Sequence, residues 1–280
     1  VLKELEVRKD YVEEEVIRTI YFGGGTPSQL NSEEFGRIFN TVYQYYDVAS
    51  DAEITFEANP DDLTVDFFDS IADQPFNRLS IGIQTFDDGE LKFLNRRHSA
   101  QAAIDAVKLA QDRGFSNISI DLIYGLPDQT IETWRRNLDV ALSLDIQHIS
   151  AYHLIYEEKT ALYRMLKKHK VEEIDEDLSN DMFSLLIDHL RKGGFEHYEI
   201  SNFAMNGAYS KHNTSYWSGE KYLGIGPSAH SYNGKDRTWN VSSLTKYINA
   251  LEKNKLDVEF EMLDIDKQYN DFILTGLRTK

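Results

Sequence analysis

The chain has 280 residues, of which 41% are hydrophobic, so it is long enough for one large barrel or sandwich or for two modest domains. It carries 30 Lys and Arg against 47 Asp and Glu, and a formal net charge of −17 repels nucleic acid and anionic membrane surfaces. No apolar run approaches the roughly 20 residues of a membrane-spanning helix. Composition therefore excludes broad polyanion binding and predicts no transmembrane segment.

The sequence contains no cysteine, so it can form no disulfide, which is typical of an intracellular, cytoplasmic protein. Residues 1–6 have the pattern of mid-helix, without a Met, a cap or a signal peptide. Residues 272–280 stop inside an apolar helical pattern. We therefore expect a portion of a longer chain, truncated in its C-terminal region.

The first predicted strand, Thr19–Phe22, leads directly into three glycines and a Thr-Pro pair, residues 23–27. A β-branched and aromatic run favours a strand, and glycines leave main-chain amides and carbonyls open to a ligand. Either Ser28 or Asn31 can cap the helix that we expect to begin near Ser32. The loop lies where α/β proteins bind ligands, which favours a ligand-binding role. The alternative is that the glycines only form a tight turn between the strand and the helix.

Short β-rich runs alternate with longer helical patterns along the chain. The further predicted strands are Glu53–Glu57, Leu79–Gln84, Ile118–Tyr124, His148–His153 and Glu196–Ile200. The predicted helices between them are Ser32–Tyr46, Thr64–Ala72, Ala100–Arg113, Ile131–Leu144 and Glu173–Lys192. Such units imply an α/β fold with a parallel sheet and helical crossovers. Because no unit carries the Gly-x-Gly-x-x-Gly dinucleotide fingerprint, we expect a (β/α) barrel or partial barrel rather than a Rossmann domain.

The sequence pattern changes after Ser201. The stretch to Trp239 is rich in aromatic residues, Gly, Ser and Asn, with little helical periodicity, and helical pattern resumes at Ser243–Lys253 and near Lys267–Leu277. We therefore divide the chain into a barrel, residues 1–200, and a smaller C-terminal α+β region, residues 201–280, packed against it.

Polar residues stand at the ends of the predicted strands, where a purely structural barrel needs none. Glu57, Gln84 and Asp121 belong to the second, third and fourth strands, and Arg96 lies in a following connection. Functional groups of barrels gather at the carboxyl ends of the strands, so we expect Glu57, Gln84 and Asp121 to face one cavity above the glycines, with Arg96 available as a clamp for a carboxylate. An unpaired carboxylate is costly inside an apolar strand, so Asp121 needs a partner or a ligand. Each of the others, taken singly, is also compatible with a helix cap or a surface ion pair.

This set of groups suits a zwitterionic ligand that carries a sugar. An acidic residue and backbone carbonyls can hold an ammonium group, and a guanidinium can hold a carboxylate. Amide and carboxylate side chains such as those of Gln84 and Asp121 can bond ribose hydroxyls.

Four motifs in order, residues 21–27, 57–60, 77–86 and 121–127, are similar to those of the radical S-adenosylmethionine (SAM) enzymes of the oxygen-independent coproporphyrinogen III oxidase group. The resemblance covers essentially the whole chain. It implies a partial (β/α)6 barrel, whose first strand and cluster loop would precede Val1, with SAM bound beside a [4Fe–4S] cluster. By position it implies SAM contacts at Gly24, Gly25, Thr26, Glu57, Gln84, Arg96 and Asp121, and a weaker one at Ile155.

The chain departs from this family at the cluster ligands. The family holds its cluster with Cys-x-x-x-Cys-x-x-Cys, and a [4Fe–4S] cluster needs thiolates, which this sequence lacks. The chain as it stands is therefore expected neither to hold a cluster nor to cleave SAM reductively. We expect a missing N-terminal segment rather than a natural loss.

The stretch His212 to Trp217 resembles the His-Asn-x-x-Tyr-Trp motif of the HemW heme chaperones within this group. A neutral imidazole can ligate heme iron, and aromatic faces can pack on a macrocycle. The alternative is a histidine and two aromatic residues that pack the C-terminal region onto the barrel. His230, in a second glycine-bearing turn, is another candidate ligand, although we prefer a packing role for it. The resemblance implies heme contacts at His212, Asn213, Tyr216 and Trp217, with His212 as the possible iron ligand.

The sequence is therefore compatible with three functions. The first, which we expect, is a heme chaperone that binds heme, SAM and, in the intact protein, a [4Fe–4S] cluster, and passes heme to a respiratory protein. The second is an oxygen-independent coproporphyrinogen III oxidase or dehydrogenase of porphyrin biosynthesis, which decarboxylates propionates by a 5′-deoxyadenosyl radical. The third is a barrel that binds a nucleotide-like metabolite without radical chemistry.

Overall fold

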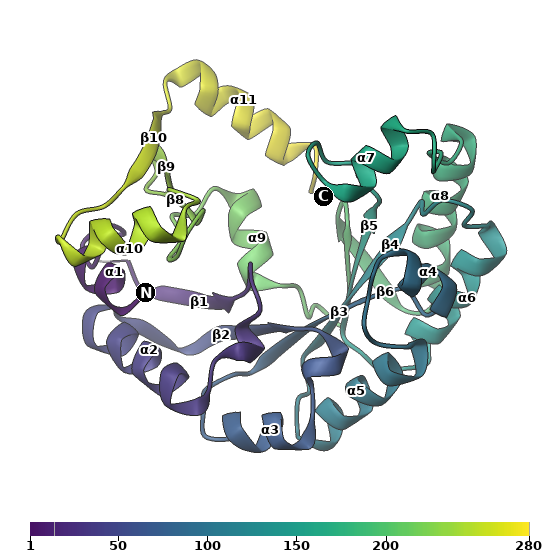
Figure 1. The fold of residues 1–280 in the computed structure, drawn as a ribbon, viewed down its shortest axis with the longest axis horizontal. Coiled ribbons are helices and arrows are strands. Elements are labelled where there is room, and N and C mark those ends of the chain that lie inside the picture. Colours follow the sequence, from purple (N-terminus) through teal and green to yellow (C-terminus); the bar gives the residue numbers. More distant parts are fainter. Residues whose placement is uncertain (14, 280) are drawn as a thin grey trace. The chain divides into compact units, whose positions relative to one another are not determined.

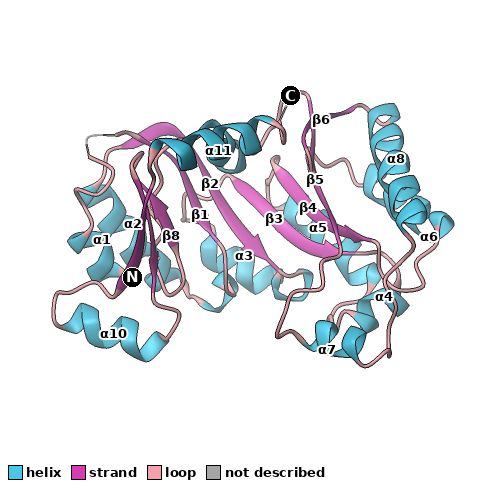
Figure 2. Cartoon of the chain, turned by 90° about the horizontal axis from the view of Figure 1, so that it is seen from above, coloured by secondary structure: helices cyan, strands magenta, loops and turns pink. Residues whose placement is uncertain are grey.

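The computed structural model describes residues 1–13 and 15–279, which form an α/β fold with two sheets (Figures 1 and 2). The larger sheet has seven strands in the order β1-β2-β3-β4-β5-β7-β6, and the smaller sheet has three in the order β10-β9-β8. Among the described residues the order of the larger sheet ends at β1 on one side and at β6 on the other, so this sheet is open. The expected α/β fold with a partial barrel and a smaller C-terminal α+β part is confirmed.

The chain packs into two compact units. We call Phe22–Ser28 with Thr55–Tyr209 the sheet unit, and Val1–Tyr21 with Gln29–Ile54 and Ser210–Lys280 the terminal unit. The domain division after residue 200 remains a prediction. Within the described ranges, no helix has both the length and the apolar content needed to cross a membrane.

The sheet unit contains most of the larger sheet. Its strands are the end of β2 (Val48–Ala58), β3 (Arg78–Gln84), β4 (Ile118–Tyr124), β5 (His148–His153), β6 (Phe195–Glu199) and β7 (Asn202–Met205). Its helices are α3 (Val65–Ile71), α4 (Asp88–Phe93), α5 (Ala100–Asp112), α6 (Ile131–Leu142), α7 (Ala161–Lys167) and α8 (Glu176–Lys192). Figure 1 shows α3, α5 and α6 along the outer side of these strands.

Strands β2 to β5 pair in parallel, with Glu57 beside Ser80 and Asp121 beside Ser150. A parallel sheet covered by crossover helices needs apolar residues along its strands. Ile81, Ile120 and Ile149 are accordingly 0% exposed. This packing fixes the carboxyl ends of β2, β3 and β4 at one edge of the sheet, as the strand pattern predicted.

The predicted sixth parallel strand at Glu196–Ile200 is wrong in direction. Strands β6 and β7 form an antiparallel hairpin, and β7 also pairs antiparallel with β5, with Asn202 opposite Ser150. Only residues 200 and 201 separate the two strands. A parallel connection needs a crossover of about a dozen residues or more, so this short link permits only the antiparallel arrangement.

The terminal unit combines the start of the chain with its end. Its strands are β1 (Ile17–Phe22), the start of β2, β8 (His230–Tyr232), β9 (Asp236–Asn240) and β10 (Val258–Met262). Its helices are α1 (Leu2–Val7), α2 (Ser32–Tyr45), α9 (Lys211–Ser218), α10 (Leu244–Glu252) and α11 (Ile265–Gly276). Asn31, rather than Ser28, caps α2: its side chain accepts from the Glu34 amide, and the Glu34 carboxylate accepts from the Asn31 amide.

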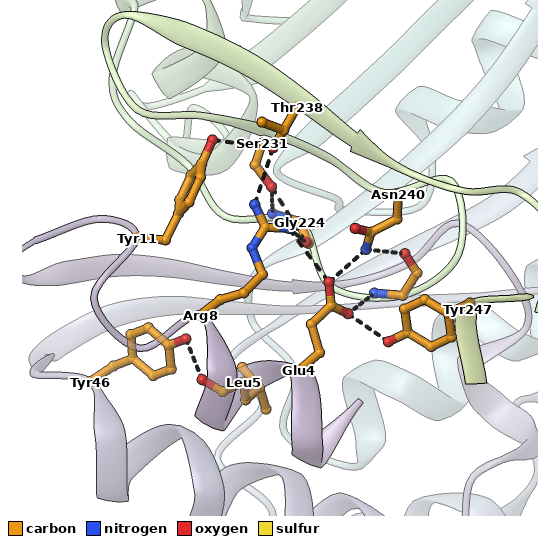
Figure 3. Close-up of polar contacts among 11 residues, drawn as sticks. Glu4, Leu5, Arg8, Tyr11, Tyr46, Gly224, Ser231, Thr238, Asn240 and Tyr247 are labelled. Carbon is orange, nitrogen blue, oxygen red and sulfur yellow. Dashed lines mark hydrogen bonds and ion pairs between the residues drawn. The ribbon is translucent and has the colours of Figure 1, made fainter. Parts of the chain in front are cut away.

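A buried carboxylate on α1 joins the two ends of the chain within this unit (Figure 3). Glu4 is 0% exposed and accepts hydrogen bonds from the Gly226 amide at 2.9 Å and from Asn240 Nδ2 at 2.6 Å. The Tyr247 hydroxyl donates to the same carboxylate at 2.5 Å, and the Arg8 guanidinium lies 3.5 Å from it. The carboxylate therefore has charge and hydrogen-bond partners on every side, as a buried ion requires.

Arg8 extends this cluster to the smaller sheet. Its guanidinium donates to the Gly224 carbonyl at 3.4 Å and to Thr238 Oγ1 at 3.1 Å, and it stacks over the Tyr11 ring at 4.4 Å. Gly224 cannot carry a side chain, because a Cβ atom there would lie 2.1 Å from the His230 carbonyl oxygen. The turn that contains Gly224 and Gly226 is thus held between α1 and β8.

Candidate functional site

The glycine loop presents bare main chain beside a carboxylate of the sheet unit. Residues 23–26 are exposed, and Gly24 adopts a φ of 73°, which favours glycine. A Cβ atom added at Gly24 or Gly25 would meet nothing within 4 Å. The Gly24 amide donates to Glu57 Oε2 at 3.1 Å, so the loop is joined to the end of β2. Thr26 is exposed in the same loop.

The end of β3 is irregular at Gln84. This residue has a φ of 75°, and the pairing with β4 shifts register between Ile81 and Gln84. A left-handed conformation costs a non-glycine residue about 1 kcal/mol or more, and such strain is concentrated at functional sites. A Cβ atom at Gly82 would lie 2.9 Å from Gln84 Nε2 and 3.0 Å from Arg96 Nη2. Glycine at this position therefore lets both side chains lie against the strand.

Arg96 is held at this strand end by a hydrogen bond from Nη2 to the Gly82 carbonyl at 2.6 Å. Its Nε is buried and has no hydrogen-bond partner among the described residues. Burial lowers the pKa of Arg96, and the nearby charges of Asp61 and Asp121 oppose that shift. The guanidinium therefore lies in a partly dehydrated position between carboxylates.

Asp121 lies between its neighbouring strands, where the sequence predicted a need for a partner. Burial raises the pKa of Asp121 to about 7, and the negative charge of Glu57 adds to the rise. A hydrogen bond with Ser150 and the positive charges of Arg78 and Arg96 act in the opposite direction. Asp121 is therefore a carboxyl group that changes charge near neutral pH, which is typical of functional sites.

The structure thus connects most of the predicted SAM residues. The Gly24 amide donates a hydrogen bond to Glu57, and the charges of Glu57 and Arg96 both affect the pKa of Asp121. The side chains of Arg96 and Gln84 both lie against Gly82. Ile155 is 70% exposed, beyond the end of β5. In residues 1–13 and 15–279, no group of three possible metal-ligating side chains occurs. Together with the absence of cysteine, this means that the residues present do not fit a [4Fe–4S] cluster.

A buried polar network lies behind the same strand ends, and the sequence analysis did not identify it. The Thr85 hydroxyl bonds the Glu90 carboxylate, and it lies 3.2 Å from Asn137 Oδ1. Gln129 donates to Glu90 at 3.1 Å and accepts from the Gly125 amide at 2.8 Å. Burial raises the pKa of Glu90, while these hydrogen bonds oppose the rise. The network ties the turn after β3 to the turn after β4, a link between separate segments that no local pattern signals.

The motif that begins at His212 lies on α9, a helix that the sequence analysis did not predict. No residue of α9 is buried, so it lacks the apolar face that marks other helices. The signals that could have revealed it are its ends: Ser210 is the N-cap, and Gly219, with a φ of 71°, ends the helix. Glu53 on β2 accepts from the Lys211 amide at 3.1 Å and from the His212 amide at 3.0 Å. A buried carboxylate thus meets the positive end of the helix.

His212 is held between strand and helix within the terminal unit. Its Nδ1 lies 2.9 Å from Thr19 Oγ1, and its Nε2 lies 3.0 Å from the Tyr216 hydroxyl. Its ring stacks on Tyr21 with centroids 4.8 Å apart and an angle of 17°. Burial lowers the pKa of His212 to about 4, so the imidazole is neutral at pH 7. A neutral imidazole is the form that ligates iron, and here its Nε2 is paired with a tyrosine.

The other predicted heme residues also lie on α9. The Asn213 backbone amide donates to Ser210 Oγ at 3.2 Å. The Arg278 guanidinium lies over the Trp217 ring, 4.9 Å from its centroid. His230 is exposed on β8 and stacks on Trp239 with ring centroids 5.8 Å apart.

Residues 2–141 match the model of the family described as the Radical SAM superfamily. The chain belongs to this superfamily. This radical SAM protein is 37% identical over 266 residues to the heme chaperone HemW of Lactococcus lactis subsp. lactis (strain IL1403). The aligned region covers 95% of this chain and 70% of that protein. It is 36% identical over 264 residues to HemW of Bacillus subtilis (strain 168), covering 94% and 70%.

The radical SAM fold is also evident in a solved structure. Coproporphyrinogen III oxidase (HemN) from Escherichia coli, described as a radical SAM enzyme, matches with a TM-score of 0.80 and 23% identity. The match covers 99% of this chain and 69% of that one, and at this identity it shows the shared fold. Membership of the superfamily implies SAM and a [4Fe–4S] cluster, and the chain contains no cysteine for the cluster.

Proposed function

We propose that this radical SAM protein is a heme chaperone that binds heme at α9. The observation that carries the proposal is His212, a neutral imidazole between the rings of Tyr21 and Tyr216 on a helix whose residues all retain some exposure. A protonated imidazole has no lone pair for iron, so the low pKa of His212 keeps it ready to bind at pH 7. The similarity to HemW over most of the chain supports the same function. Asn213 and Trp217 complete the proposed heme contacts.

We assign SAM to the strand ends of the sheet unit. The carboxylate of Glu57 and the main chain of Gly24, Gly25 and Thr26 suit the ammonium group of the methionine moiety. Arg96 suits its carboxylate, because a guanidinium has further donors beyond the one used by Gly82. Gln84 and Asp121 suit the ribose hydroxyls, and Ile155 offers an exposed apolar side chain. A [4Fe–4S] cluster in the intact protein would have to be held by ligands outside these residues, because the chain contains no cysteine.

A heme chaperone needs a protein that receives the heme, and we propose a heme-accepting respiratory protein in the cytoplasm as that recipient. The alternative is an oxygen-independent coproporphyrinogen III oxidase, with which the chain shares its fold. The two functions differ in what they do with a porphyrin: the chaperone holds heme, and the oxidase decarboxylates propionates.

A titration of the full-length protein with ferric heme tests the chaperone function. We expect a shifted Soret band for the wild type and at least a tenfold loss of affinity for His212→Ala, because the iron loses its imidazole ligand. His230→Ala is the matched control, since it removes an exposed histidine of the same unit that packs on Trp239. If His212→Ala leaves the heme affinity unchanged and the protein turns over coproporphyrinogen, the result would favour the oxidase.

A further inference from the structure

Both ring nitrogens of His212 are occupied by hydroxyl groups. Thr19 Oγ1 lies 2.9 Å from Nδ1, and the Tyr216 hydroxyl lies 3.0 Å from Nε2. A neutral imidazole has one N–H donor and one lone pair. One hydroxyl must therefore donate to the ring while the other accepts from it, and the choice decides which nitrogen can bind a metal.

The chemistry of the two hydroxyls settles that choice. A phenol is more acidic than an aliphatic alcohol and is the stronger hydrogen-bond donor. The phenol is therefore the expected donor to Nε2, which leaves Nδ1–H to donate to Thr19 Oγ1.

The two partners of His212 also differ in their surroundings. Thr19 belongs to a strand, β1, whereas Tyr216 is 40% exposed and lies one turn further along α9. The Tyr216 ring meets His212 and Tyr222 edge-on, at 5.1 Å and 4.8 Å between centroids. The Nδ1 side of the imidazole is thus anchored in a sheet, and the Nε2 side is covered by a ring that borders on solvent.

We propose that Thr19 and Tyr216 are positioning residues for His212: the phenol that donates to Nε2 and the Thr19 oxygen that accepts from Nδ1–H together fix the tautomer whose lone pair is on Nε2, and the Tyr216 hydroxyl occupies that lone pair until heme iron binds there. The ligand role rests on the proposed heme binding. A metal-bound histidine typically donates its other N–H to a neighbouring oxygen, which here is Thr19 Oγ1. The Tyr216 ring must turn away from Nε2 as iron binds.

Nitrogen-15 NMR of the histidine rings in the heme-free, full-length protein tests the first half of the proposal. We expect His212, assigned by its loss in His212→Ala, to carry its proton on Nδ1. Thr19→Val should give a mixture of tautomers, and Thr19→Ser should restore the single one, because serine keeps the hydroxyl. A wild-type ring protonated on Nε2 would overturn the assignment without any bearing on heme binding.

Stopped-flow mixing with ferric heme tests the second half. Tyr216→Phe keeps the ring and removes the hydroxyl, so we expect the association rate to rise at least threefold, with no phenol left to displace. An unchanged rate, in a protein whose heme binding is lost in His212→Ala, would overturn the covering role of Tyr216. If His212→Ala instead leaves heme binding intact, the proposed function fails and the ligand role fails with it, whereas the tautomer result stands.

Discussion

At the scale of single residues, Asp121 is a carboxyl group whose charge depends on pH near neutrality. Its folded-state pKa of about 7 lies above the ordinary value of 3.8, chiefly because of burial. A raised pKa means that the folded state binds the proton more tightly than the unfolded state does. The contribution of Asp121 to stability is therefore fully present below pH 4 and is lost as the pH rises through 7.

We expect Asp121→Asn to show this dependence directly. The amide is neutral at every pH, so the free energy of unfolding of the variant, relative to wild type, should rise by on the order of 2–4 kcal/mol between pH 4 and pH 8. Urea unfolding at pH 4, 6 and 8 measures it. The exposed Asp105→Asn on α5 is the control and should show no such rise. A difference for Asp121→Asn that is constant with pH would contradict the prediction.

The sequence predicts that Glu57 and Asp121 lie on strands, and the structure places them on β2 and β4; their role in binding stays a prediction. In a parallel sheet the carboxyl ends of neighbouring strands lie at one edge, so polar residues there must be close. The hydrogen bond from Arg96 to Gly82 could not be predicted, because it depends on the shifted register and the left-handed backbone at Gln84. Such local irregularities follow from packing rather than from residue pattern.

At the scale of elements, α9 depends on Glu53. This residue is 6% exposed, and its carboxylate accepts hydrogen bonds from two backbone amides at the start of the helix. Glu53→Gln keeps the shape but removes the negative charge at the positive helix end, so we expect a loss of about 1–2 kcal/mol in the free energy of unfolding. Faster hydrogen exchange of the α9 amides should accompany it, and heme affinity should fall because His212 is the second residue of the helix.

Asp51→Asn is the matched control for Glu53→Gln. Asp51 lies on the same strand, and its carboxylate is 83% exposed, 3.6 Å from the Lys211 amine. Exposed ion pairs contribute little to stability, so the free energy of unfolding should change by less than about 0.5 kcal/mol. Equal losses in the two variants would show that α9 needs only general negative charge on β2.

Elements with a buried face are predictable from sequence, and elements without one are not. The predicted strands Ile118–Tyr124 and His148–His153 coincide with β4 and β5, because each carries buried apolar residues at alternate positions, such as Ile120 and Leu122 in β4 and Ile149 and Ala151 in β5. Helix α9 has no buried residue, so periodicity gives no signal, and only its caps mark it. The direction of β6 depends on a two-residue link, which a count of strands alone does not take into account.

At the scale of the whole molecule, the terminal unit depends on Glu4. Its carboxylate compensates the buried Arg8 and accepts from the Gly226 amide, so Glu4→Gln leaves a buried cation unpaired. Breaking a buried pair from one side costs about 3–5 kcal/mol. We expect hydrogen exchange to accelerate across the terminal unit, while β3 to β5 of the sheet unit keep their protection, because local units of a protein can open separately.

Glu6→Gln is the control for this prediction. Glu6 lies on the same helix, and its side chain is 47% exposed in a pair with Lys3 at 2.9 Å. An exposed pair of this kind stabilises by less than about 1 kcal/mol, so exchange in both units should match wild type. Loss of protection in β3 to β5 of the Glu4→Gln variant would show that the chain unfolds as a single cooperative body.

The position of Glu4 has a consequence for the order in which this chain matures during its synthesis. The carboxylate leaves the ribosome 222 residues before the Gly226 amide and 243 residues before the Tyr247 hydroxyl. At about 5–20 residues per second, it waits roughly 10 to 50 s for its partners. In that interval β3 to β5 are already available to pair, whereas α1 must stay hydrated. The sheet unit is therefore expected to assemble first, and closure around Glu4 follows only after Gly226 and Tyr247 have been synthesised.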